Sequence, residues 1–151
     1  MLIGQFNIAR ARWDLDDPLM KPFFDAVPPV NALAERTPGF VWRLEDDSEM
    51  IATHFAHEPR FTMTLSVWKD VASLRHFTWN TLHKKFRLKT HEWFEKMDEA
   101  YLAVWPIADD HRPTGAEAVE MLAELRRTGP TERVFGTEAL MPEAVVRWRL
   151  Q

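Results

Sequence analysis

The apolar residues of this chain change their spacing several times, and the order of these changes constrains the fold more than any other feature. Residues 2–9 alternate an apolar face with a mixed one at a period of two, which is typical of a strand. The spacing becomes helical after Asp17 and again after Asp70. With two strands between these helices and one after them, the order predicts an α+β, ferredoxin-like βαββαβ sandwich. The four expected strands are residues 2–9, 40–44, 61–68 and 101–107.

Breaks in the pattern indicate where the elements end. The pair Pro28-Pro29 is expected to interrupt the first helix, and the turn Thr37-Pro38-Gly39 to end it. Residues 45–60 are polar enough to predict a loop. The second helical stripe, from Val71 to Met97, is long and is expected to break near Lys89.

A further helix is predicted towards the C-terminus. Pro113-Thr114 followed by Glu117 has the pattern of a capping box, and Gly129-Pro130 is a stop signal. We therefore expect one domain over residues 1–131, which includes this C-terminal helix. Residues 132–151 are expected to form a C-terminal extension packed on that domain.

Composition excludes several classes of function. A net charge of -4 argues against a nucleic-acid groove, because phosphate binding needs a concentrated basic surface. The absence of cysteine excludes disulfides, thiolate metal sites and cysteine nucleophiles, and it permits a reducing compartment. The first arginines follow the apolar start, the reverse of a secretory signal, and no uncharged run is long enough for a membrane span. We expect a cytoplasmic protein without a membrane or nucleic-acid partner.

The chain holds seven tryptophans and ten phenylalanines, more large aromatic side chains than a routine core of 151 residues requires. On the third strand the odd-numbered side chains suit the face that helices cover. This leaves Thr64, Ser66 and Trp68 on the other face, together with Gln5 and Asn7 of the first strand. Because two helices can cover only one face, we expect the second face to pack against its copy in a homodimer and to enclose a cavity.

His83 is the first candidate for chemistry. It falls at the edge of the second helix's apolar stripe, with Trp79 one turn before it and Phe86 on the same side. A histidine there can act as a general base, because its pKa lies near neutrality, or as an axial ligand to haem. The alternative is a structural histidine at the helix boundary that bonds a carbonyl.

Asn7 and Arg87 are the other candidates. An amide in the middle of an apolar strand should face a polar cavity or bond a neighbouring loop, and both interpretations stay open. Arg87 follows His83 by one turn, so either Asn7 or Arg87 could stabilise an oxyanion.

Five aromatic side chains are candidates for binding a flat, conjugated ligand, although core packing explains each of them equally well. These are Trp42, Trp68, Trp79, Phe86 and Trp105. His54 and His57 have an H-x-x-H spacing, but without cysteines or carboxylates in a helical register this is a poor metal signal, and no metal site is expected.

From about Phe6 to Thr131 the chain resembles the family known as domain of unknown function 3291 (DUF3291), within the dimeric α/β-barrel superfamily that includes antibiotic-biosynthesis monooxygenases. The resemblance rests on the order and spacing of several short strings and on His83. The strings are FNIAR (6–10), PVNALAERTPGFVWRL (29–44), LSVWKDVASLRHF (65–77), EWFE (92–95), HRPTGAEA (111–118) and GPT (129–131).

The resemblance implies a ferredoxin-like fold that pairs into a dimeric α/β barrel with a central cavity. Superfamily activities range from cofactor-free oxygenation to haem chemistry and plain ligand binding. We therefore expect a small monooxygenase-like enzyme for an aromatic or polycyclic substrate, working without a cofactor or with haem on His83. The alternative is a non-catalytic ligand-binding or sensory dimer. In the haem-degrading members of the superfamily an asparagine, a tryptophan and a histidine act together, and alignment puts Phe77 and Arg87 at the last two positions.

Overall fold

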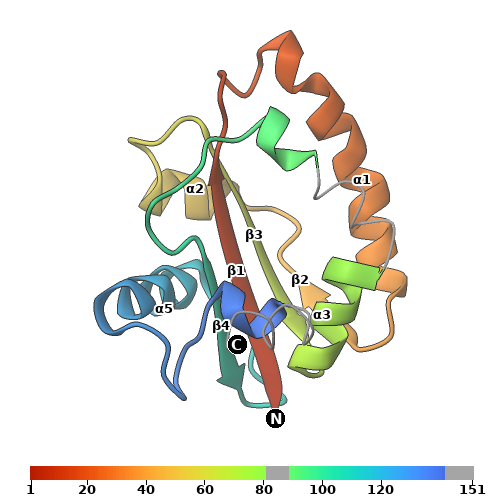
Figure 1. The fold of residues 1–151 in the computed structure, drawn as a ribbon, viewed down its shortest axis with the longest axis vertical. Coiled ribbons are helices and arrows are strands. Elements are labelled where there is room, and N and C mark those ends of the chain that lie inside the picture. The colour runs from red at the N-terminus through yellow and green to blue at the C-terminus, as the bar shows by residue number, and fades with distance from the viewer. Residues whose placement is uncertain (81–88, 142–151) are drawn as a thin grey trace, which may run out of the picture.

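The computed structural model of the chain describes residues 1–80 and 89–141 (Figure 1). It consists of a four-stranded sheet with helices around it. The elements are β1 (Leu2–Arg10), η1 (Pro18–Met20), α1 (Lys21–Arg36), β2 (Phe40–Arg43), α2 (Ser48–His54), β3 (Phe61–Trp68), α3 (Val71–Asn80), η2 (Thr90–Glu92), β4 (Leu102–Ile107), α5 (Gly115–Thr128) and η3 (Thr137–Leu140).

The sheet has the strand order β2-β3-β1-β4, and every neighbouring pair is antiparallel. This confirms the predicted α+β, ferredoxin-like class, with β1 and β3 in the interior of the sheet. Gln5 pairs with Ser66 and Asn7 with Thr64, so these four side chains share one face.

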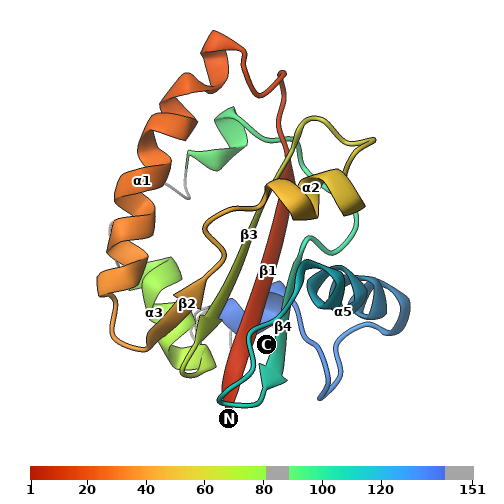
Figure 2. The same cartoon turned by 180° about the vertical axis from the view of Figure 1, so that it is seen from behind.

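Helices cover both faces of the sheet (Figures 1 and 2). α1 and α3 pack on the face that carries Ile3, Trp68 and Val104, which we call the α1/α3 face. α2 and α5 pack on the opposite face, which carries Phe6 and Leu65 and which we call the α5 face. Each face therefore has a separate apolar core.

The sequence-based assignment of the two faces is wrong. The face of Ser66 and Trp68 was expected to be bare, yet α1 and α3 pack on it. Leu65 and Val67 turn instead towards α2 and α5. The physical reason is that α2 and α5 cover the face of Leu65 and Val67, which leaves the face of Ser66 and Trp68 to α1 and α3. A homodimer therefore cannot be argued from an uncovered sheet.

α1 continues through Pro28 and Pro29 as one helix of 16 residues, so the predicted interruption is wrong. A proline inside a helix leaves the carbonyl four residues earlier without its N–H donor. Here those carbonyls belong to Phe24 and Asp25, which are exposed, as both prolines are. Water can therefore satisfy the carbonyls, and the helix persists.

α2 lies in the segment that was predicted as a polar loop. The Asp46 carboxylate accepts hydrogen bonds from the Ser48 N–H and hydroxyl at 3.0 and 2.7 Å, which lowers the pKa of Asp46 and orders the entry to the helix. Met50 and Phe55 are then buried on the α5 face. With 7 residues, α2 is too short to produce a recognisable helical repeat.

The expected break near Lys89 is confirmed, because Lys89 immediately precedes η2. The helical stripe predicted beyond it, as far as Met97, is wrong. Trp93 follows η2 and packs with Ala11 and Met20 in a third small core, and Phe94 forms a β-bridge with Ala11.

The predicted C-terminal helix is confirmed as α5. The Thr114 hydroxyl accepts the Glu117 N–H at 3.2 Å and caps the helix start. The helix ends at Gly129, whose φ of +72° is costly for any residue with a side chain. No helix in the described part of the chain is long and apolar enough to cross a membrane.

Residues 132–141 run along the outer edge of β4 and across to α3. Val104 and Phe135 exchange backbone hydrogen bonds of 2.8 and 2.9 Å. Arg75 donates to the Ala139 carbonyl at 2.8 Å, so this segment is tied to α3 as well. The strand-like alternation in residues 145–150 lies outside the described residues.

Candidate functional site

Four polar side chains lie in the middle of the α1/α3 face, where an ordinary core would be apolar. They are Gln5 and Asn7 on β1 and Thr64 and Ser66 on β3, and we call them the polar strip. Both strands are interior strands, so the strip lies at the centre of the sheet. Burying polar groups without partners is costly, so each member needs a hydrogen bond or access to water or a ligand.

One end of the polar strip is a buried chain of hydrogen bonds. The Trp68 Nε1–H donates to Ser66 Oγ at 3.0 Å, and the Ser66 hydroxyl donates to Gln5 Oε1 at 2.7 Å. The Gln5 amide N–H then donates to Thr64 Oγ1 at 3.3 Å. Gln5 is only 7% exposed. This chain fixes the orientation of the Gln5 amide before any ligand arrives.

The other end of the polar strip is open. Thr64 is exposed although β3 is an interior strand, and its neighbour Asn7 is half-buried. No hydrogen bond joins the Asn7 side-chain amide to another residue of the described ranges. The strip therefore offers a free amide, with donors and an acceptor, beside an accessible hydroxyl.

α1 lies over this face without closing on it. Of its 16 residues only Ala34, close to the helix end, is buried. Val27 and Val30, nearer the middle of the helix, are half-exposed. A helix that covered a fully packed face would bury a continuous apolar stripe. Its one buried position and the exposed Thr64 both show that the middle of α1 does not pack tightly on the sheet.

Aromatic clusters lie at both ends of the polar strip. Trp68 stacks on Phe77 of α3 with ring centroids 5.3 Å apart, and Phe40 meets Trp68 edge-on at 5.4 Å. At the far end of β1, Phe23 of α1 lies 5.8 Å from Trp93 and 4.8 Å from Phe94. The polar centre is thus bounded by apolar ring systems.

The proposed tryptophans do not gather around one space. Trp68 belongs to the α1/α3 face but is 1% exposed, so it is a core residue that touches the strip through Ser66. Trp42 and Trp105 lie in the core of the opposite face, separated from Trp68 by the sheet. Trp79, on α3, is half-buried and its indole N–H donates to the Leu140 carbonyl.

Three of the predicted site residues, His83, Phe86 and Arg87, lie outside the described residues. The other histidines provide no metal centre: in residues 1–80 and 89–141 no three His, Asp or Glu side chains are grouped closely enough to hold an ion. His54 and His57 lie at the end of α2 and just after it. His111 pairs with Glu117 at 2.7 Å at the start of α5.

One ion pair beside the strip had no sequence signal. Arg43 on β2 lies opposite Ser66 in the register, and its Nε donates to Glu35 of α1 at 2.8 Å. The pair links α1 to the edge of the sheet. Glu35 and Arg43 are eight positions apart with a turn between them, so neither helical nor strand periodicity could have predicted the contact.

The comparisons with known proteins agree with this architecture. The family model described as "Domain of unknown function (DUF3291)" matches residues 2–148. The chain belongs to the DUF3291 family. The family resemblance inferred from the sequence is thereby confirmed. None of the curated proteins compared with this DUF3291 chain matches it significantly.

Solved structures that share the fold of the DUF3291 chain include the following two. A conserved protein from Methanosarcina mazei has a TM-score of 0.53 at 14% identity, over 72% of this chain and 94% of its own. Rv0793 from Mycobacterium tuberculosis has a TM-score of 0.53 at 9% identity, over 73% of this chain and 98% of its own. A weaker likeness, with a TM-score of 0.48 and 12% identity over 72% and 94%, is to SnoaB, a cofactor-independent oxygenase from Streptomyces nogalater.

Proposed function

We propose that this protein is a small-molecule enzyme of the monooxygenase-like type, which holds an aromatic or polycyclic substrate between α1 and the polar strip. One observation carries the proposal: Thr64 is exposed in the middle of an interior strand, beneath a helix whose only buried residue is Ala34. A flat substrate in this space would have aromatic clusters at both ends and hydrogen-bonding groups at the centre.

The polar strip is a poor explanation of stability by itself. Apolar residues at Gln5 and Ser66, the two buried members, would pack this face without the desolvation that polar groups cost. The sequence instead keeps four polar side chains there and leaves Asn7 without a described partner. The two accessible members, Asn7 and Thr64, are hydrogen-bonding groups of the kind that fixes the orientation of a ligand.

The proposed chemistry needs no cofactor. A base removes a proton from an activated methylene carbon of the substrate, and the resulting carbanion passes an electron to dioxygen. The two radicals combine, and protonation gives a hydroperoxide that loses water to leave a carbonyl. One dioxygen is consumed and one water released per methylene oxidised to a carbonyl. We assign His83 as the base, and Asn7 or Arg87 as the donor that stabilises the substrate oxyanion.

Oxygen uptake with anthrone, a flat tricyclic ketone with an acidic methylene group, tests the proposal. We expect protein-dependent oxygen consumption, with the anthraquinone formed in equal amount. Asn7→Ala should lower turnover by about 100-fold, as for loss of an oxyanion donor, and leave the melting temperature nearly unchanged. Thr62→Ala, on the same strand face, is the control and should retain activity. His83→Ala should lower turnover by roughly 100-fold while the protein stays folded.

A non-catalytic ligand-binding role is the alternative, and one observation favours it. Every member of the polar strip is neutral, so the described part of the site can orient a ligand but contains no acid or base. Saturable binding of anthrone without oxygen uptake above the blank would establish this alternative and overturn the proposed enzyme activity.

The polar strip by itself does not fit a haem site. Axial ligands to haem iron are His, Cys, Met or Tyr side chains, and none belongs to the polar strip. A haem bound at the polar strip would need an axial ligand from outside it, such as His83. A Soret band in the purified protein, lost in His83→Ala, would be needed to support a haem function.

We also propose that the protein acts as a homodimer in the cytoplasm. The edge strand β2 supports the dimer, because all four of its residues are half-buried, Val41 and Trp42 among them, and Leu44 follows in the same state. The absence of cysteine supports the compartment, since it suits a reducing environment.

A further inference from the structure

A pocket of about 440 Å³ lies on the α5 face, on the other side of the sheet from the polar strip. Its floor consists of Phe6 and Ile8 of β1, Phe61 of β3, and Phe55, which follows α2. The wall is α5, including the exposed Ala123. A volume of this size is within the range of small-molecule sites.

The floor of the pocket is formed by three phenyl rings. Phe55 lies between Phe6 and Phe61, with centroid distances of 6.4 and 5.7 Å. Phe6 is fully buried, and Phe55 and Phe61 are 9% and 7% exposed, so only small parts of the Phe55 and Phe61 rings are open to the pocket. Such a surface attracts an apolar chain or ring and offers it no hydrogen bonds.

Two arginines of the last turn of α5 line the pocket, and their pairing differs. Arg126 is engaged: its Nε donates to the Ala100 carbonyl at 2.9 Å, and its Nη1 lies 3.4 Å from Glu99. Arg127 has only a distant partner, because its Nη2 is 4.0 Å from Glu124 Oε1. Arg127 is therefore the arginine that can turn to a ligand.

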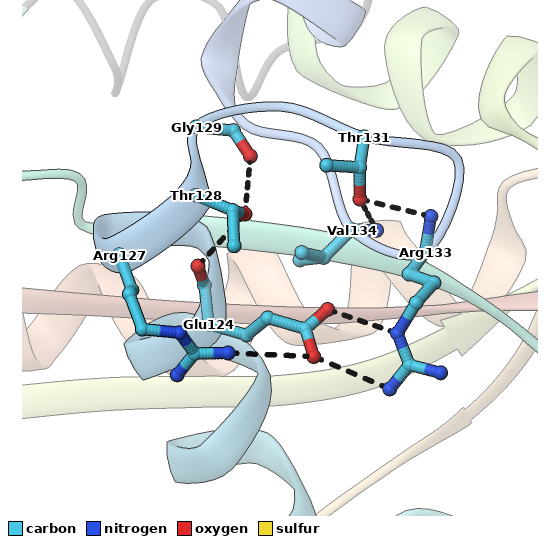
Figure 3. A network of polar contacts seen from close by, with 7 residues as sticks. All are labelled: Glu124, Arg127, Thr128, Gly129, Thr131, Arg133 and Val134. Carbon is cyan, nitrogen blue, oxygen red and sulfur yellow. Dashed lines mark hydrogen bonds and ion pairs between the residues drawn. The ribbon is translucent and has the colours of Figure 1, made fainter.

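The Glu124 carboxylate is already compensated by Arg133 (Figure 3). Arg133 donates to its two oxygens at 3.1 and 3.2 Å, and these bonds raise the pKa of Arg133. An arginine that donates to both carboxylate oxygens forms a stronger pair than a single contact at 4.0 Å. The positive charge of Arg127 is thus left largely without a counter-charge.

We propose that this pocket binds a carboxylate with an apolar tail, such as a medium-chain acid. The tail lies on the phenyl floor, and the carboxylate pairs with Arg127 at the mouth. Basic residues in the last turn of a helix also stabilise the helix dipole, which accounts for the position of Arg126 and Arg127. The dipole does not account for an apolar pocket next to an uncompensated guanidinium.

The pocket is independent of the proposed enzyme function. Phe6 and Ile8 project from β1 to the α5 face, whereas Gln5 and Asn7 project to the α1/α3 face. Anthrone turnover and binding at the pocket are therefore separate measurements, and failure of one leaves the other standing.

Calorimetric titration with decanoate tests the proposal. We expect saturable binding with one site per chain. Acetate, which lacks the tail, and decanol, which lacks the charge, should each bind at least tenfold more weakly. Equal affinity for decanol and decanoate would overturn the role of Arg127, and the absence of saturable decanoate binding would overturn the site.

Two pairs of variants locate the binding. Ala123→Trp should fill the pocket and abolish binding, whereas Ala116→Trp, at an exposed α5 position outside the lining, should not. Arg127→Gln should weaken binding about tenfold, and Arg112→Gln, an exposed arginine before α5, should not. Because Arg127 is exposed, its variant remains informative even if Ala123→Trp disturbs the fold. Decanoate binding that survives both Ala123→Trp and Arg127→Gln would place the ligand elsewhere.

Discussion

Ser66 donates its hydroxyl proton to Oε1 of Gln5 at 2.7 Å and so joins β3 to β1 on the face beneath α1. The same Ser66 oxygen accepts the Trp68 indole N–H at 3.0 Å. One hydroxyl therefore couples the position of a core tryptophan to the orientation of the strip's buried amide.

Replacing Gln5 by alanine should destabilise the protein. The substitution leaves the buried Ser66 hydroxyl without its acceptor and opens a cavity, so we expect a loss of about 1–3 kcal/mol in the free energy of unfolding. Urea titration followed by tryptophan fluorescence measures it. Thr62→Ala, on the same strand face but outside the hydrogen-bond chain, should lower the free energy of unfolding clearly less. Equal losses for the two variants would show that these hydrogen bonds make no particular contribution to stability.

Gly39→Ala should be among the more damaging small substitutions. The φ of Gly39 is +93°, and a Cβ there would overlap with Oγ and Cβ of Ser73. Gly129→Ala is the matched comparison, because Gly129 also has a positive φ, of +72°, but nothing within 4 Å of the added carbon. We expect a lower melting temperature for Gly39→Ala than for Gly129→Ala, and the reverse order would contradict the contact with Ser73.

Asp70 should contribute to stability in a pH-dependent way. The Ser73 hydroxyl and N–H donate to its carboxylate at 2.7 and 2.8 Å, which lowers the pKa of Asp70 in the folded protein. A lowered folded pKa gives stability that is complete above the unfolded value, roughly 4, and is lost as the pH falls through the folded pKa.

The test compares melting temperatures of the natural chain and Asp70→Asn from pH 7 down to about pH 2.5. The natural chain should be the more stable at pH 7, and the difference should shrink below about pH 4. Asp16→Asn controls for the loss of one negative charge. A difference that stays constant over the whole range would show that the hydrogen bonds do not perturb Asp70.

The proposed homodimer predicts a mass of about 35 kDa by light scattering, twice the 17.7 kDa of the chain. If β2 forms the interface, Trp42→Lys should shift the mass towards the monomer, because it puts a charge among partly buried apolar residues. Leu19→Lys, at an exposed apolar residue of η1, is the control and should leave the mass unchanged. A monomer at micromolar concentration would refute the dimer.

Elements with local signals could be predicted from the sequence. The period-two pattern of residues 61–68 coincides with β3, and Thr114 and Gly129 cap α5 as expected. The alternation of side chains along the first and third strands was also sufficient to predict that four polar residues share one face, namely Gln5, Asn7, Thr64 and Ser66. In each case the residues that carry the sequence pattern belong to the predicted element or directly flank it.

Features that depend on the path of the whole chain could not be predicted. The alternation of side chains along a strand separates two faces but does not say which helices cover each of them, so the faces were exchanged. Trp105 and Trp68, candidates for one ligand site, lie on opposite sides of the sheet. The pair Arg43–Glu35 joins different elements and leaves no periodic trace. The roles proposed for His83, Phe86 and Arg87 stay predictions, because these residues lie outside the described ranges.

β1 presents amide side chains to one face of the sheet and phenyl or aliphatic side chains to the other. The register of β1 is therefore as constrained as its composition. An insertion or deletion of one residue inside the strand would reverse every side chain beyond it, turning Phe6 towards α1 and Gln5 into the phenyl floor. Related chains should therefore vary in the identity of residues along this strand but hold its length fixed, and differences in length should collect in the loops at its two ends.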